Sequence, residues 1–167
     1  MAVSATTRPL RRGEVDGREY RFLSESEFVR GVVEDDFLEH VVYVSGQRYG
    51  TLRSEVERIL KAGKSCILEL ETQGAKEVEA RMPDAVSVFV GPPSFAELER
   101  RLRERATESS GEIGERLDLA RRQLDEAGDF DHVVTNTDVE RAVDELEAIV
   151  DAELTAGTGS AGKLSAT

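Results

Sequence analysis

The sequence has no long hydrophobic run, a single cysteine and too few basic residues to balance its acidic ones. A membrane-spanning helix needs roughly 18 or more consecutive apolar residues, and no run approaches that length. Residues 1–4 are too few for a signal peptide. The lone Cys66 cannot form an internal disulfide, which fits a reducing compartment, and its apolar surroundings favour a buried structural thiol over a reactive one. We therefore expect a cytoplasmic protein.

The shortage of positive charge excludes two classes of partner. The 167 residues include 22 Lys and Arg against 34 Asp and Glu, a formal net charge of −12. Proteins that bind nucleic acid by neutralising phosphates, or that adhere to anionic membranes, need the opposite sign. We expect neither a nucleic-acid nor a membrane partner. The hydrophobic content of 39% is enough for the core of one domain of ordinary size.

Strand-like apolar runs alternate with helical patterns along the chain. The runs are FLEHVVYV (37–44), CILELE (66–71), AVSVFV (85–90) and DHVVTN (131–136). Continuous apolar runs are typical of strands covered on both faces, so the alternation predicts an α/β domain with a largely parallel sheet. In such sheets ligands bind at the carboxyl ends of the strands.

Helix boundaries are marked by capping residues. Three helix starts fit the capping box, in which a hydroxyl is followed three residues later by a carboxylate. These pairs are Ser24 with Glu27, Ser94 with Glu97, and Thr137 with Glu140. Two further helices are predicted over 53–62 and 112–127, ending before Gly63 and Gly128 respectively.

The end of the chain, residues 155–167, is small and polar and predicts a disordered tail. Gly157, Gly162 and Lys163 match part of the G-x-x-x-x-G-K-[ST] phosphate-binding loop. Leu164 stands where that motif needs Ser or Thr, and no strand precedes it. We interpret the match as coincidental.

Five arginines lie in the segment TTRPLRRGEVDGREYRF (6–22), which is unexpected in so acidic a chain. Pro9, Gly13 and Gly17 predict a loop there. A guanidinium directs two N–H donors at phosphate oxygens, so Arg8 and Arg11 suit a phosphomonoester ligand. The hydroxyls of Tyr20 and Tyr49 could add donors, although each tyrosine considered alone is more typical of packing.

A second set of charged residues lies farther along the chain. Glu69 and Glu71 close a predicted strand, and the two-residue strand period puts them on one face. Arg101 and Arg105 share a helix face, which fits either phosphate binding or an ordinary salt-bridged surface helix. His40 and His132 are far apart without nearby Cys or His, so no metal site is predicted.

The segments SATTRPLRRGEVDGREYRFLS, FLEH, RYGT, ILELETQG, PPSFAELERRLRERATE and VVTNTD resemble the guanylate kinase family, in order and at close to its spacing, over about residues 3–150. The resemblance implies a P-loop NTPase-like parallel sheet flanked by helices, with an inserted GMP-binding β-rich subdomain and a lid. It implies a guanylate kinase-like domain over 1–154, with the tail at 155–167. Within it, 5–65 would be the GMP subdomain, 66–104 and 128–154 the core, and 105–127 the lid.

The resemblance also implies site residues for ATP-dependent phosphorylation of GMP to GDP, with ATP and Mg²⁺. GMP would be bound by Ser4, Arg8, Arg11, Glu14, Tyr20, Glu39, Tyr49, Thr51, Glu69 and Glu71. The catalytic arginines would be Arg101, Arg105 and Arg116, and ATP would contact Arg105 and Asn136. Carboxylates such as Glu39 and Glu71 suit guanine because its N1–H and amino group both donate. Glu71 stands where the family usually has Asp.

One departure from the family is larger. The family's first strand, P-loop and first helix have no counterpart in these residues, and a chain without them is expected to be inactive. We expect a wrongly chosen start or a fragment rather than a natural deletion. The alternative to an enzyme is an inactive module that binds GMP or a phosphorylated or acidic protein segment.

Overall fold

The structure is a computed structural model that describes residues 1–43, 46–105 and 110–157; the side chains of residues 105, 110–112 and 157 lie outside the description. The chain divides into two compact units, Met1–Pro83 and Asp84–Thr167, and each is described by itself. In the described ranges, none of the helices combines the length and apolar composition needed to cross a bilayer.

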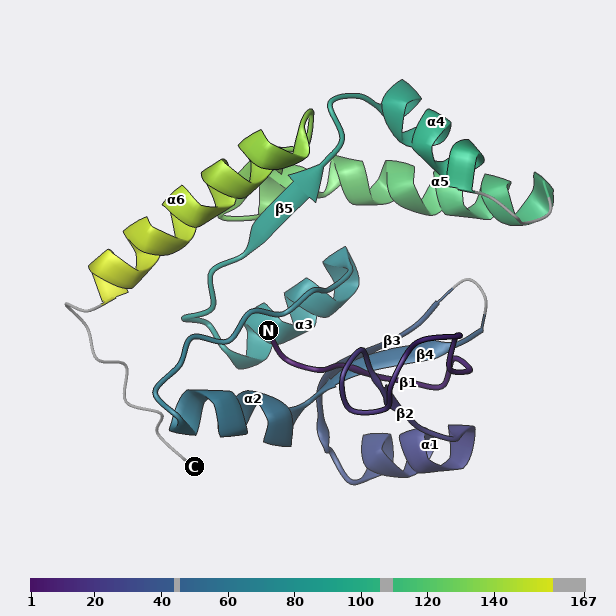
Figure 1. Ribbon diagram of the computed structural model, residues 1–167, viewed down its shortest axis with the longest axis vertical. Coiled ribbons are helices and arrows are strands. Elements are labelled where there is room, and N and C mark those ends of the chain that lie inside the picture. The colour runs from purple at the N-terminus through teal and green to yellow at the C-terminus, as the bar shows by residue number, and fades with distance from the viewer. Residues whose placement is uncertain (44–45, 106–109, 158–167) are drawn as a thin grey trace. The chain divides into compact units, whose positions relative to one another are not determined.

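Unit 1 is a small mixed sheet with helices on two sides. Its elements are β1 (Ala5–Thr6), β2 (Arg21–Phe22), α1 (Glu25–Val33), β3 (Phe37–Val42), β4 (Arg48–Leu52), α2 (Arg53–Lys61) and α3 (Thr72–Arg81). The strand order is β2-β1-β4-β3, with β1 parallel to β2 and the other pairs antiparallel. Figure 1 shows α1 and α3 on opposite sides of this sheet.

Unit 2 contains a parallel strand pair. Its elements are β5 (Val88–Gly91), α4 (Phe95–Arg105), α5 (Ser110–Asp125), the 3-10 helix η1 (Ala127–Asp129), β6 (His132–Thr135) and α6 (Val139–Gly157). β5 and β6 pair in register from Val88 with His132 to Gly91 with Thr135. His132 Nε2 lies 3.0 Å from Glu153 Oε1, which joins β6 to α6. The guanidinium of Arg121 in α5 lies 4.5 Å from the ring centroid of Phe95 in α4.

The predicted capping residues are confirmed at α1 and α4, whereas at α6 the capping residue is the one after the predicted Thr137. Ser24 forms a full capping box with Glu27 at α1, and Ser94 Oγ accepts from Glu97 N (3.2 Å) at α4. At α6 the capping residue is Asp138, whose Oδ1 accepts from the backbone N–H groups of residues 140 and 141. Asp138 takes the role predicted for Thr137 because its carboxylate reaches both amides.

Helix ends agree with the predictions at α2 and differ at α5 and α6. Gly63 follows α2 with φ of 71°, as its predicted role requires. The helix predicted over 112–127 runs instead over Ser110–Asp125, and Gly128 lies in the 3-10 turn that follows. α6 extends to Gly157, whereas the predicted tail began at residue 155. Residues 158–167 lie outside the described part of the chain.

Two predictions about the strands were wrong. The run CILELE forms no strand with the described residues, although the hydrogen bond from Ala2 N to Ile67 O (3.0 Å) joins it to the chain start. The run FLEHVV forms β3 in the antiparallel part of the mixed sheet, whereas a largely parallel arrangement was predicted. Residues 73 and 74, which follow the run CILELE, lie in the first turn of α3.

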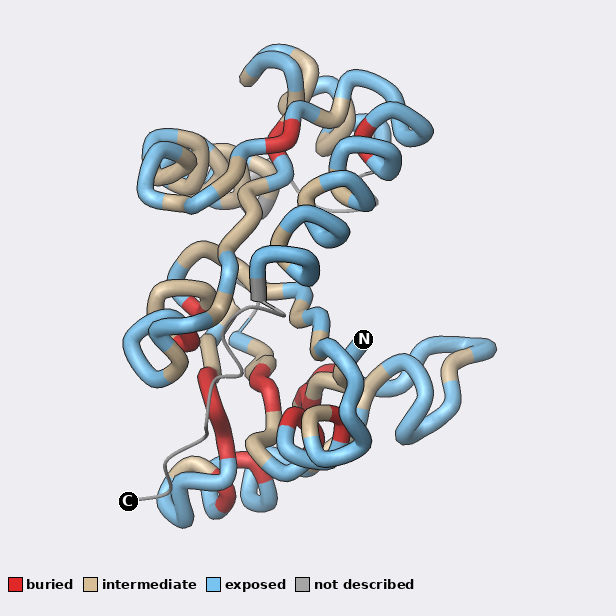
Figure 2. The backbone as a smooth tube through the Cα atoms, turned by 90° about the vertical axis from the view of Figure 1, so that its left-hand side faces the viewer, coloured by how far each residue is buried: buried red, intermediate tan, exposed pale blue. Residues whose placement is uncertain are grey.

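A β-bulge in β3 lets Phe37 and Glu39 point to opposite sides of the strand. The pairing register shifts between Phe37 and Glu39. Phe37 stacks on Phe28 of α1, with ring centroids 4.3 Å apart, whereas Glu39 points toward Gly74 of α3. Buried segments, red in Figure 2, include this part of the sheet. β3 therefore supplies a core residue on one side and a buried carboxylate on the other.

Replacing Phe28 by alanine tests this core. Phe28 is fully buried, so Phe28→Ala should lower the free energy of unfolding by about 3–5 kcal/mol in urea denaturation. Val33→Ala in the same helix is the control, since Val33 is 81% exposed; surface changes of this kind stay within about 0.5 kcal/mol. Equal effects of the two substitutions would contradict the assignment of the core.

Candidate functional site

The first part of the candidate site is built around Arg8, which follows β1 and is 7% exposed. Its guanidinium donates two hydrogen bonds to Glu14 (3.0 and 2.8 Å) and one to the carbonyl oxygen of Pro9 (2.8 Å). Glu14 Oε2 also accepts from Arg11 N (2.7 Å). The hydrogen bond from Arg8 is the main cause of the lowered pKa of the Glu14 carboxyl. Glu14 thus ties Arg8 to the backbone at Arg11.

Aromatic rings enclose the Arg8 guanidinium. Its central carbon lies 5.3 Å from the ring centroid of Tyr20 and 5.5 Å from that of Phe22. Tyr49 of β4 meets Tyr20 edge to face, with centroids 5.9 Å apart. Burial chiefly raises the pKa of Tyr20, and the charges of Tyr49 and Glu69 add to the rise. The structure therefore brings together four predicted residues, Arg8, Glu14, Tyr20 and Tyr49, with Glu69 nearby.

The remaining predicted residues of unit 1 have varied surroundings. The carbonyl oxygen of Ser4 accepts from Arg21 N (2.9 Å) where the chain enters β1. Ser4 is half-buried, and Arg11 is exposed on the loop. Glu69 is exposed while Glu71 is half-buried, and the segment that carries them is not a strand. The prediction that a strand would align these two carboxylates therefore does not hold.

The second part of the candidate site is a buried carboxylate beside a buried hydroxyl. Glu39 of β3 and Thr51 of β4 are cross-strand partners, 3% and 0% exposed. Burial raises the pKa of the Glu39 carboxyl, and the negative charges of Glu77 and Glu71 raise it further. Thr51 lowers this pKa and so offsets part of the rise. The hydroxyl of Thr51 itself has no hydrogen-bond partner of normal geometry among the described residues. A buried orphan hydroxyl calls for an explanation such as a ligand.

The two parts lie on the same face of the sheet. Tyr49 and Thr51 are two residues apart in β4, so their side chains point to the same side. Glu39 pairs with Thr51, and Val41 pairs with Tyr49. Glu71 immediately precedes α3, and burial raises its pKa as well. One face of unit 1 therefore has a cationic end at Arg8 and a buried acidic end at Glu39 and Glu71.

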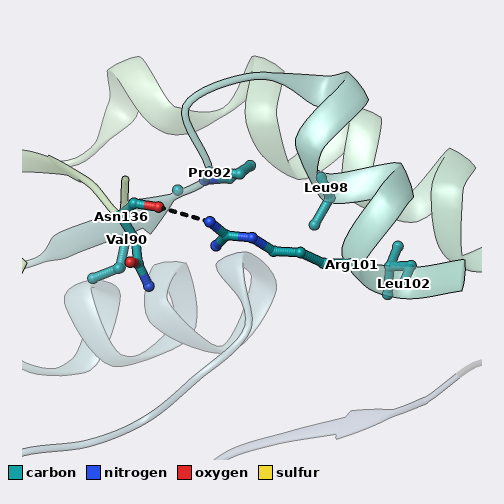
Figure 3. Close-up of a pocket in the computed structure, with 7 residues that line it drawn as sticks. Val90, Pro92, Leu98, Arg101, Leu102 and Asn136 are labelled. Atoms are coloured by element: carbon teal, nitrogen blue, oxygen red, sulfur yellow. Dashed lines mark hydrogen bonds between the residues drawn. The ribbon is translucent and has the colours of Figure 1, made fainter. Parts of the chain in front are cut away.

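Unit 2 has a separate cavity of about 230 Å³. It is lined by Val90, Gly91, Pro92, Leu98, Arg101, Leu102 and Asn136. Arg101 reaches from α4 to the carbonyl oxygen of Asn136 (3.3 Å), as Figure 3 shows, and its Nε donates to Glu97 (2.7 Å). Sequence reasoning found Arg101 and Asn136 but missed the apolar lining. The spacing of Pro92, Leu98 and Leu102 around the start of α4 was the available signal.

The other arginines of α4 and α5 have different surroundings. Arg100 pairs with Glu97 and Glu104, and Arg103 pairs with Glu99, as on an ordinary surface helix. Hydrogen bonds from Arg100 and Arg101 lower the pKa of Glu97 to about 2. Arg116 of α5 is half-buried and is not among the residues that line the cavity. Arg105 ends α4, and its side chain lies outside the described part.

Within the described ranges, no three His, Cys, Asp or Glu side chains gather closely enough to hold a metal ion.

The guanylate kinase family model matches residues 1–153. The chain belongs to the guanylate kinase family. A guanylate kinase of Thermobifida fusca is 46% identical over 155 residues, which cover 93% of this chain and 79% of that protein. Guanylate kinases of Frankia casuarinae and Rubrobacter xylanophilus are 47% and 48% identical, with 90% and 89% of this chain and 81% and 78% of theirs covered.

A solved guanylate kinase structure agrees with this assignment. The guanylate kinase from Anaplasma phagocytophilum superposes with a TM-score of 0.75 at 33% identity, covering 91% of this chain and 74% of that one. The fold is therefore that of the guanylate kinases, an α/β fold of the P-loop NTPase type, and the family expectation drawn from the sequence is confirmed. Guanylate kinases are nucleoside monophosphate kinases, so the chain belongs to a family of these enzymes.

The raised pKa of Glu39 predicts how stability varies with pH. A carboxyl whose pKa is raised by folding contributes stability below its unfolded pKa of about 4.3, and that contribution is lost as pH rises through the raised value. Glu39→Gln should therefore be more stable than the wild type at pH 7, with the difference vanishing near pH 4, in urea denaturation across that range.

Glu57→Gln is the control of opposite sign. A hydrogen bond from Lys61 lowers the pKa of Glu57, so that carboxylate contributes stability above its unfolded pKa. This exposed substitution should cause a small loss at pH 7. A loss of stability in Glu39→Gln at pH 7 would contradict the assigned cost of its burial.

Proposed function

We propose that this protein transfers the γ-phosphate of ATP, as its magnesium complex, to GMP and forms GDP and ADP. Family membership over residues 1–153 carries the proposal, and relatives named guanylate kinase at 42–48% identity support it over a module without turnover. The reaction belongs to purine nucleotide metabolism. The lone cysteine fits a cytoplasmic location.

The acidic end of the unit 1 face suits a guanine base. Guanine presents an N1–H and an exocyclic amino group, and both donate hydrogen bonds. We assign these donors to the carboxylates of Glu39 and Glu71, with the orphan hydroxyl of Thr51 as a further partner. The low exposure of Glu39 favours strong hydrogen bonds to the base, because water competes little there. Binding should weaken in acid as the raised pKa of Glu39 is crossed.

The cationic end suits the phosphate of GMP. The three hydrogen bonds that Arg8 donates to Glu14 and Pro9 use three of the five N–H donors of a guanidinium. The bonds fix its orientation, so little side-chain entropy is lost when a phosphate binds. We assign Arg11 and the hydroxyls of Ser4, Tyr20 and Tyr49 to the same group, with Glu14 as the residue that orients the loop and Glu69 at its edge.

The unit 2 cavity suits the base of ATP. Its lining is largely apolar, with the amide of Asn136 as a polar group that can face adenine. We assign Arg101, Arg105 and Arg116 to the phosphate that is transferred. In phosphoryl transfer, guanidinium groups act by stabilising charge on the equatorial oxygens. Glu97 and the carbonyl oxygen of Asn136 would hold Arg101 in one orientation for that role.

Calorimetric titration with GMP and with guanosine tests the phosphate end. Arg8→Ala removes a charge-assisted donor, so its affinity for GMP should fall at least about tenfold. Guanosine has no phosphate, and its affinity should change little. Arg18→Ala is the matched control, since Arg18 lies in the same loop, is 62% exposed and pairs with Glu19. Equal losses for GMP and guanosine would remove Arg8 from phosphate binding.

Turnover by the polypeptide of residues 1–167 alone is a separate prediction. These residues contain no complete G-x-x-x-x-G-K-[ST] sequence, whose amides, Lys and hydroxyl stabilise the transferring phosphate. The purified polypeptide should bind GMP yet form GDP far below the roughly 1–100 s⁻¹ typical of kinases, in a coupled assay with ATP and Mg²⁺. GDP formation at an ordinary rate would refute this, and GMP binding in the same preparation checks that the site is folded.

A further inference from the structure

Gly74 occupies a position where the carboxylate of Glu39 leaves no room for a side chain. It is the third residue of α3 and is buried. A Cβ atom on Gly74 would lie 2.7 Å from Glu39 Oε2, 3.3 Å from its Cδ and 3.6 Å from its Cγ. Carbon and oxygen atoms that are not bonded do not approach to 2.7 Å, so the carboxylate fills the space that a methyl group would need.

The backbone does not require glycine at this position. Left-handed φ values occur at Gly13, Gly17, Gly46 and Gly63 among the described glycines, and Gly74 has an ordinary helical conformation. Glycine is less favourable than alanine inside a helix because its backbone loses more entropy on folding. Glycine at position 74 therefore weakens the helix relative to alanine. Among the described contacts of unit 1, the benefit of glycine here is the space it leaves for the Glu39 carboxylate.

Other crowded glycines have a different neighbour. A Cβ atom on Gly31 or Gly91 would first meet a phenylalanine ring, and one on Gly50 would meet the backbone of β3 and the Phe37 ring. Those glycines allow core packing. At Gly74 the nearest atom is instead the end of an ionisable side chain that we assign to the substrate.

The position of α3 is fixed at its far end. Arg81, the last residue of α3, donates from Nη1 to Asp35 Oδ1 (3.2 Å) and to the carbonyl oxygen of Phe37 (3.3 Å). Asp35 is also held by two hydrogen bonds from Arg53 Nη2 (3.0 and 2.9 Å). Because these contacts fix the helix against β3, an added methyl group should displace the flexible end of Glu39 rather than the helix.

We propose that Gly74 is a positioning residue for base recognition: by carrying no side chain, it sets where the Glu39 carboxylate stands and thereby the affinity for the guanine base. The inference rests on the proposed function, which assigns Glu39 to the guanine edge. A charge-assisted hydrogen bond requires donor and acceptor about 2.7–2.9 Å apart, so a carboxylate moved by several tenths of an ångström loses much of it.

The test is calorimetric titration of the full chain with GMP, together with thermal denaturation. Gly74→Ala should weaken GMP binding about tenfold or more while leaving the melting temperature unchanged or higher. The matched control is Gly114→Ala in α5, where an added Cβ atom would meet nothing within 4 Å. It should leave GMP affinity unchanged. An unchanged affinity in Gly74→Ala would overturn the inference.

A double variant shows whether the methyl group acts through Glu39. Glu39→Asp withdraws the carboxylate by one methylene, so adding Gly74→Ala to Glu39→Asp should change GMP affinity less than twofold. An equal loss in both backgrounds, or a lowered melting temperature in both, would mean a general structural effect and would also overturn it. Failure of the wild type to bind GMP would instead refute the proposed function on which the inference rests.

Discussion

The burial of the Glu39 carboxylate is the constraint around which unit 1 is arranged. A charge removed from water is costly unless it is paired, and the raised pKa of Glu39 reflects that cost. Three features keep the group in place nonetheless. The β-bulge turns it away from the phenylalanine core, α3 leaves it space at Gly74, and Arg81 fixes α3 against β3. The fold retains an unfavourable group, which is typical of a site maintained for binding.

The mixed sheet connects this carboxylate to the arginine loop. β4 carries Tyr49 and Thr51 on one face, and it pairs with β1 on one side and with β3 on the other. β1 leads directly into Arg8, while β3 carries Glu39. A nucleotide has an anionic phosphate at one end and a donor-rich base at the other when the base is guanine. The sheet therefore presents cationic and acidic groups in the order that such a ligand requires.

Local signals in the sequence predicted much of the fold. Capping hydroxyls marked the starts of α1 and α4, glycine marked the end of α2, and β-branched runs marked β3, β5 and β6. The failures depend on contacts between distant residues. Residues 66–71 have strand composition, yet whether they pair depends on a neighbour that composition does not specify. α3 was missed because no side chain caps it at Glu71 and because Gly74 resembles a turn residue.

For the candidate site too, local features could be predicted from the sequence, whereas features that depend on contacts between distant residues could not. The arginine loop could be predicted because charge on a Pro- and Gly-interrupted segment is a local feature. The alignment of Glu69 with Glu71 was wrong because it assumed a strand period that the chain does not follow. The orphan hydroxyl of Thr51 and the crowding at Gly74 become visible only when β3, β4 and α3 are assembled. Motif resemblance named Thr51 without giving the reason for it.

The cationic end of the candidate site lies in a chain whose net charge is −12, so its positive charge has to be local. A buried Arg8 without a partner would be costly, so Glu14 neutralises it and holds it in one orientation before any ligand arrives. Neutralisation also lowers the attraction for a phosphate. Arg11 is more exposed than Arg8, and among the described contacts its hydrogen bond to Glu14 comes from its backbone N–H, so its guanidinium is the more accessible charge on this loop. Orientation and attraction are thus divided between two arginines three residues apart. Under the proposed function, that division would let a protein with a net charge of −12 bind a phosphate at one point of its surface.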